Sequence, residues 1–129
     1  MTTELTYLTL VTLLTALMWI PYILNLITVR GLLDAVGYPD DPPPMAAWAS
    51  RMKAAHYNAV ENLVIFAVLV LVVQTSGSNS ALTATACMLY FWTRLVHALC
   101  YTLAIPWVRT LAFAVGVLCQ LSLAWELLI

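Results

Sequence analysis

Polar side chains gather in a few short stretches of an otherwise apolar chain. The run RMKAAHYNAVENLVIF, residues 51–66, contains Asn58 and Glu61. The run RLVHALCY contains Arg94 and His97, and Arg109 follows shortly after in IPWVRTLAF. Cations that converge on one cavity without enough acids to neutralise them attract an anionic ligand. These stretches therefore predict a site for an anion, provided that the fold brings them together.

The composition indicates the kind of fold that must position these polar residues. Of 129 residues, 64% are hydrophobic and 9% are charged, with a formal net charge of -1. Such a composition is typical of an integral membrane protein and lies far from that of soluble domains. Five Lys and Arg residues are too few for the basic surface that nucleic acid requires. Cys87, Cys100 and Cys119 stand in apolar runs and are interpreted as small buried hydrophobes, so no metal site is predicted.

Apolar runs long enough to cross a bilayer predict a single all-α domain, residues 1–129, with four transmembrane helices. The helices are expected at about residues 5–28, 45–75, 80–105 and 106–129. The first run is too long for a signal peptide and lacks a basic start, so it is expected to be retained. Residues 31–44 contain Gly, Asp and a triple Pro and are expected to form a loop without helix.

The distribution of basic residues predicts the orientation. Arg30, Arg51 and Lys53 flank the first loop, Arg109 lies near the third, and the second loop has no Lys or Arg. By the positive-inside rule, the first and third loops face the cytoplasm. Both termini then lie on the non-cytoplasmic side.

The depth of the charged residues predicts an ion pair. Glu61 precedes Gln74 by 13 residues and Arg94 follows Ala81 by 13 residues, so both lie ~20 Å from the non-cytoplasmic helix ends. A lone charge at this depth costs about 3 kcal/mol or more, which favours pairing within a bundle. Glu61 and Arg94 are therefore expected to pair between antiparallel helices.

Helical spacing places further polar residues beside this pair. The second, third and fourth predicted helices each present one polar face, and these three faces are predicted to enclose a pocket that opens to the cytoplasm. The faces consist of Asn58, Glu61 and Asn62; of Tyr90, Arg94, His97 and Tyr101; and of Arg109, Phe113, Gly116 and Gln120. Structural roles are the alternative to ligand contact. The amides of Asn58 and Asn62 could hydrogen-bond between helices, and His97 could be a core histidine. His56 points away from the Glu61 face and is interpreted as structural.

The same stretches resemble a known family. AHYNAVENLVIF is similar to the second-helix signature of the MAPEG superfamily, the membrane-associated proteins in eicosanoid and glutathione metabolism. RLVHALCY and IPWVRTLAF resemble the family's Arg, His, Tyr and then Pro, Arg, hydroxyl, aromatic series. With Arg30 at the end of the first helix, the similarity covers nearly the whole chain. It points to a bacterial member like the microsomal glutathione transferases, in the bacterial inner membrane.

The resemblance implies a homotrimer that binds glutathione, as thiol substrate, between subunits, while a lipophilic electrophile enters from the membrane lipids. The implied activity is that of a glutathione transferase or peroxidase. Arg109 matches the catalytic arginine that stabilises the thiolate. The implied glutathione-binding residues are Arg30, Asn58, Glu61, Arg94, His97 and Tyr101.

The chain also departs from the family pattern. Ala54 and Tyr57 stand where members often carry arginines. Arg51, with Lys53, is expected to compensate from the same helix end and is included among the glutathione-binding residues. The departures keep open a non-catalytic lipid-binding or scaffold protein. A haem-carrying helix bundle, with His56 and His97 as ligands, is a third possibility.

Overall fold

The computed structural model describes residues 1–129 and contains helices without strands. The elements are α1 (Thr3–Leu17), α2 (Trp19–Arg30), α3 (Leu32–Val36), α4 (Ala47–Ser76), α5 (Ala81–Thr102) and α6 (Pro106–Leu128). The all-helical class is confirmed. Helices α4, α5 and α6 begin and end within a few residues of the predicted bounds. Gly77 caps the end of α4, Ser80 caps the start of α5, and Pro106 begins α6.

The first predicted helix is interrupted at Met18. Pro21 has no backbone N–H, and its ring would collide with the carbonyl of Leu17 in a regular helix. The amide of Met18 instead donates to the carbonyl of Thr15, three residues back, at 3.4 Å. α1 and α2 therefore form one apolar segment, Thr3–Arg30, with a local break.

The loop between α2 and α4 is more ordered than the sequence indicates. The expectation of no helix in residues 31–44 is wrong, because Leu32–Val36 forms the short helix α3 between the Gly residues and the Pro run. Arg30 Nε donates to the carbonyl of Pro43 at 2.8 Å, and the amide of Ala46 donates to Asn25 Oδ1 at 3.0 Å. These two bonds join the start of the loop to its end.

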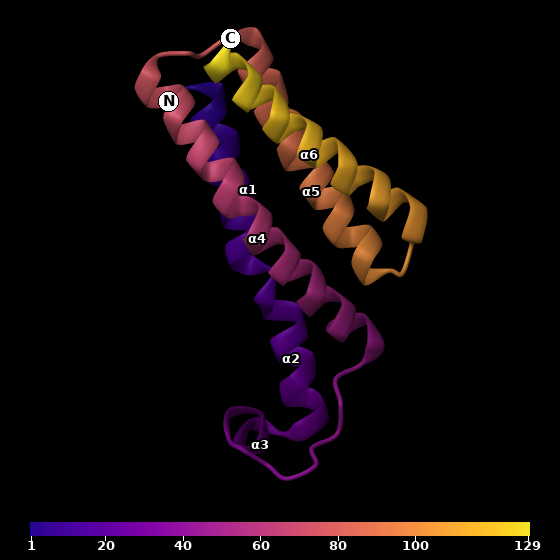
Figure 1. Ribbon diagram of the computed structural model, residues 1–129. Helices are drawn as coiled ribbons and strands as arrows, with labels where there is room; N and C mark the ends of the chain where they lie inside the picture. The colour runs from indigo at the N-terminus through magenta and orange to yellow at the C-terminus, as the bar shows by residue number, and fades with distance from the viewer.

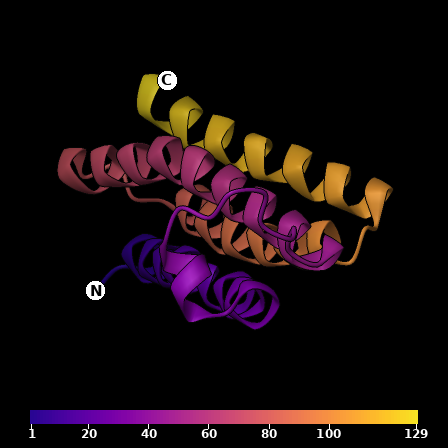
Figure 2. The same ribbon diagram turned by 90° about the horizontal axis from the view of Figure 1, so that it is seen from below.

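The long helices pack side by side, and α1, α4 and α6 all contact α5 (Figures 1 and 2). Both termini and the α4–α5 turn lie at one end of the bundle, and the α2–α4 loop and the α5–α6 turn lie toward the other (Figure 1). Three segments are long and apolar enough to cross a membrane: Thr3–Arg30, Ala47–Ser76 and Pro106–Leu128. The chain is a helical membrane protein.

The apolar core lies in the half of the bundle nearer the termini. Phe66 of α4 stacks on Tyr90 of α5 with ring centroids 3.8 Å apart, and both rings are almost fully buried. At the end of this core, Thr83 Oγ1 donates to the buried carboxylate of Glu4 at 2.6 Å. The other half of the bundle has a smaller apolar cluster around Met18, Ala55 and Ala59, and it also carries the polar residues predicted to form a site.

Candidate functional site

A polar pocket lies between α4, α5 and α6, near the α5–α6 turn. Its volume is about 240 Å³, and its lining is Asn58, His97, Tyr101, Arg109, Thr110 and Phe113. Four of these six residues belong to the predicted site. The lining contains a guanidinium and no carboxylate, so the pocket offers positive charge and hydrogen bonds to a ligand.

The α5–α6 turn fixes the position of Arg109. The amide of Ile105 donates to the carbonyl of Cys100 at 2.8 Å, and Ala104 adopts a positive φ of 60°. This turn ends α5 in the manner usually provided by glycine. Pro106 then starts α6, because a proline in the first helical position sacrifices no hydrogen bond. Arg109 consequently stands in the first turn of α6, directly opposite the last turn of α5.

Tyr101 and His97 form the α5 wall of the pocket. The guanidinium carbon of Arg109 lies 4.7 Å from the centre of the Tyr101 ring, a cation–π distance. The His97 ring lies edge-on to Tyr101 at 5.7 Å and at 6.2 Å from the ring of Phe113. The aromatic wall thus holds the cation of Arg109 beside the cavity without neutralising it.

A chain of amides closes the inner end of the pocket. Arg94 Nη2 donates to Asn58 Oδ1 at 2.6 Å, Asn62 Nδ2 donates to the carbonyl of Asn58 at 2.9 Å, and Gln120 Nε2 donates to the carbonyl of Asn62 at 3.1 Å. Arg94 is only 3% exposed. Side chains of α4, α5 and α6 are therefore joined through polar contacts just below the cavity.

The predicted pairing of Glu61 with Arg94 is wrong within the subunit. Glu61 is exposed, whereas Arg94 is buried and bonded to the amide of Asn58. Glu61 and Asn58 differ by three residues, or ~4.5 Å along the helix axis, but also by ~60° around it. That rotation turns the carboxylate to the outer face of α4 and the amide to the inner face.

Two buried polar atoms near the pocket have no hydrogen-bond partner. They are Arg94 Nε and His97 Nδ1, on side chains that are each 3% exposed. An unpaired buried polar group is costly, so such atoms usually meet water or a ligand. His97 lines the cavity, and its unpaired Nδ1 is a candidate for contact with a water or a ligand.

The other predicted binding residues lie outside the pocket of the single subunit. Arg30 bonds the carbonyl of Pro43, Arg51 Nε donates to the carbonyl of Thr102 at 2.9 Å, and Glu61 points outward. The two arginines hold a loop and a helix end. Their roles toward glutathione stay predictions.

Phe113 lines the cavity, as its place on the predicted face with Arg109 indicated. Thr110 also lines the cavity but was not predicted to do so. It follows Arg109 by one residue, a rotation of ~100° around the helix, so helical spacing from Arg109 does not identify it.

His56 has the structural role that was expected. Its Nδ1 lies 2.7 Å from the hydroxyl of Tyr22 on α2, whereas His97 belongs to the pocket wall facing α6. The two histidines thus face different helices, an arrangement that does not suit the two axial ligands of one haem. No group of three His, Cys, Asp or Glu side chains is placed to hold a metal ion.

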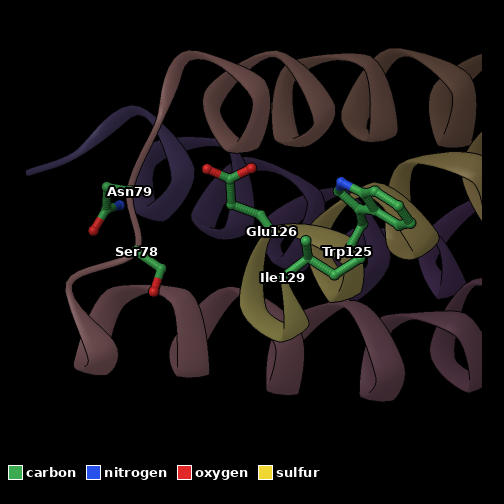
Figure 3. A pocket seen from close by; sticks show the side chains of 5 residues that line it. All are labelled: Ser78, Asn79, Trp125, Glu126 and Ile129. Atoms are coloured by element: carbon green, nitrogen blue, oxygen red, sulfur yellow. The ribbon is translucent and has the colours of Figure 1, made fainter.

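A second polar pocket, of about 370 Å³, lies at the opposite end of the bundle. Figure 3 shows Trp125, Glu126 and Ile129 at the end of α6 beside Ser78 and Asn79 of the α4–α5 turn. Its only ionisable side chain is an acid. It has no basic side chain to attract an anion, so the smaller pocket around Arg109 is the better candidate.

Comparison with known proteins agrees with the geometry. The sequence profile described as the MAPEG family matches residues 7–129. No curated protein sequence matches the chain. The match covers every helix that contributes to the pocket, and the chain therefore belongs to the MAPEG family.

Proposed function

We propose that the protein is a glutathione-dependent transferase or peroxidase that acts on lipophilic electrophiles. The observation that supports this most directly is the pocket of Asn58, His97, Tyr101, Arg109, Thr110 and Phe113, which carries an unneutralised guanidinium. Glutathione carries carboxylates and a thiol, so a cationic cavity with amide and imidazole groups matches its charge. Family membership supports the same chemistry.

Arg109 is assigned the catalytic role. A free thiol has a pKa of about 8.5 and is only a few per cent ionised at neutral pH. A guanidinium beside the sulfur lowers that pKa and raises the thiolate fraction. In a transferase step the thiolate sulfur forms a bond to an electrophilic carbon, the leaving group departs with its electron pair, and the thiol proton passes to solvent.

A complete site is proposed to need neighbouring subunits. Glu61 is exposed on α4 beside Val60, Val64 and Ile65, which are 44%, 62% and 53% exposed. A carboxylate at that depth facing lipid would cost about 3 kcal/mol or more. Three copies that share their α4 faces would cover this surface and bring Glu61 toward the site of a neighbour, together with Arg30 and Arg51. A monodisperse monomer in mild detergent would contradict this part of the proposal.

We further propose that α5 is the fourth transmembrane helix. It packs along α1, α4 and α6, all of which lie in segments apolar enough to cross a membrane. Its polar residues Arg94 and His97 are buried, so they do not meet lipid. With four crossings, both termini lie on the non-cytoplasmic side of a bacterial inner membrane and the pocket opens toward the cytoplasm.

Glutathione binding and turnover test the proposal. Titration calorimetry of the detergent-solubilised protein should detect saturable binding of reduced glutathione, and a halogenated nitrobenzene should be conjugated in its presence. Asn58→Ala should weaken binding through the lost amide contact and the disturbed Arg94. Glu126→Gln, in the pocket at the other end of the bundle, is the matched control and should bind like wild type. Absence of both binding and turnover would overturn the assignment.

A lipid-binding or scaffold protein is the second candidate. Ala54 and Tyr57 occupy positions where family arginines would add charge to the site, and Tyr57 is exposed. A folded protein that does not bind glutathione in the same titration would support this alternative.

A further inference from the structure

An apolar groove separate from the glutathione pocket lies between α1, α4 and α5. Its volume is about 250 Å³, and seven of its eight lining residues are hydrophobic, among them Met18, Met52, Leu99 and Leu103. The break in the first helix at Met18 forms one edge. The groove runs to the last turn of α5, at the same end of the bundle as the α2–α4 loop.

A cation stands at the mouth of this groove. Arg51 directly precedes Met52, a lining residue, and its Nε donates to the carbonyl of Thr102, another lining residue, at 2.9 Å. This bond fixes the guanidinium at the end of α5, while its terminal nitrogens make no hydrogen bond to the protein. Arg51 is half-buried, and the groove lining contains no acid. An anchored cation above an apolar groove is complementary to an anionic head on an aliphatic chain.

We propose that this groove binds an anionic phospholipid, with its phosphate on Arg51 and one acyl chain between α1 and α5. The acyl chain of the lipid would pack against the apolar lining of the groove. The phosphate would pair with the guanidinium of Arg51, which has no acidic partner in the protein. The groove and the glutathione pocket share no lining residue. Arg51 is also among the residues proposed above to approach a neighbour's glutathione, so the lipid site is tested by lipid retention and not by turnover. Tyr101 nevertheless contacts both regions: it lines the pocket and packs against the cluster around Met18.

Native mass spectrometry of the full-length protein tests the site with two probes, phosphatidylglycerol and phosphatidylcholine of equal chain length. The wild type should retain phosphatidylglycerol in preference. Arg51→Gln should lower that retention about tenfold, as expected for one charge-assisted contact to a phosphate. Lys53→Gln is the matched control: it removes the same charge from the same helix end, but Lys53 lies over the Tyr57 ring and away from the groove, so retention should stay within about twofold.

A second pair of variants tests the chain-binding part. Leu99 lines the groove and is 54% exposed, so Leu99→Trp should fill the groove without disturbing the core and should reduce retention of phosphatidylglycerol. Leu118→Trp, at a similarly exposed position on α6 outside any pocket, should not. Equal retention of both lipids by the wild type, or equal loss in each matched pair of variants, would overturn the proposal.

Discussion

The bond between Arg94 and Asn58 should be the main polar contact that holds α4 against α5. Arg94 is 3% exposed, its Nε has no partner, and the amide of Asn58 accepts its one side-chain hydrogen bond at 2.6 Å. Hydrogen bonds between neutral groups in membranes contribute about 0.6 kcal/mol on average. Bonds to charged groups contribute about 1.5–3 kcal/mol. Because this donor is charged and almost completely buried, the larger range applies.

A double-mutant cycle with Asn58→Ala and Arg94→Gln measures this contact. Each single variant should lower the free energy of unfolding, and the cycle should give a coupling energy of about 1.5 kcal/mol or more. The assay is equilibrium unfolding in mixed micelles with increasing dodecyl sulfate. Asn25→Ala provides the control cycle with Arg94→Gln, because Asn25 bonds the amide of Ala46 elsewhere and its coupling should be below about 0.5 kcal/mol. Additive losses for Asn58 and Arg94 would refute a direct contact.

Three further predictions concern the framework of the site, and the same unfolding assay checks each of them. Gly116→Leu should lower the free energy of unfolding by about 1–3 kcal/mol, because a Cβ at Gly116 would already contact Thr93 and Arg94 at 3.7 and 3.9 Å. Gly116→Ala should be tolerated. Equal losses for the two variants would contradict close packing of α5 on α6. Ala104→Gly should stabilise by about 1 kcal/mol because Ala104 has a positive φ; a loss of stability would show that this turn is unstrained. Thr83→Val should lower the free energy of unfolding by about 1–3 kcal/mol, because it removes a donor to the buried carboxylate of Glu4. Thr85→Val, on an exposed part of α5, should lower it far less. Equal losses for the two variants would argue against the Glu4 contact.

Sequence periodicity identified part of each face that forms the pocket. Asn58 on α4, His97 and Tyr101 on α5 and Arg109 on α6 line one pocket, as their spacing indicates. The reason is physical: most polar groups in a membrane protein face inward, so a polar face of a helix indicates its buried side. Glu61 is the exception in this chain.

The partner of Arg94 could not be obtained in the same way. Depth along a helix places Glu61 and Asn58 within ~4.5 Å of one another, so either residue satisfies the depth argument. The rotation of α4 about its axis decides between them, and that rotation depends on packing against all neighbouring helices. The small residues Ala55 and Ala59 are buried on the inner face, which leaves Glu61 on the outer face.

Local breaks were also difficult to place from the sequence. The long apolar run predicted one uninterrupted helix, although Pro21 interrupts it at Met18. The Gly and Pro residues of the α2–α4 loop masked the short run Leu32–Val36, which is long enough for a single helical turn between them. In both cases the average composition of the segment, apolar in the first and rich in Gly and Pro in the second, did not indicate the conformation of a few residues within it.

The most direct test of the proposed function is the ultraviolet absorbance of the glutathione thiolate on the protein at neutral pH. With Arg109 present, bound glutathione should be ionised to about a quarter or more, as expected if its thiol pKa falls by at least one unit. Arg109→Ala should abolish this signal, whereas Trp107→Ala, an exposed residue in the same first turn of α6, should preserve it. A full thiolate signal and undiminished turnover in the Arg109→Ala protein would contradict the catalytic assignment of Arg109.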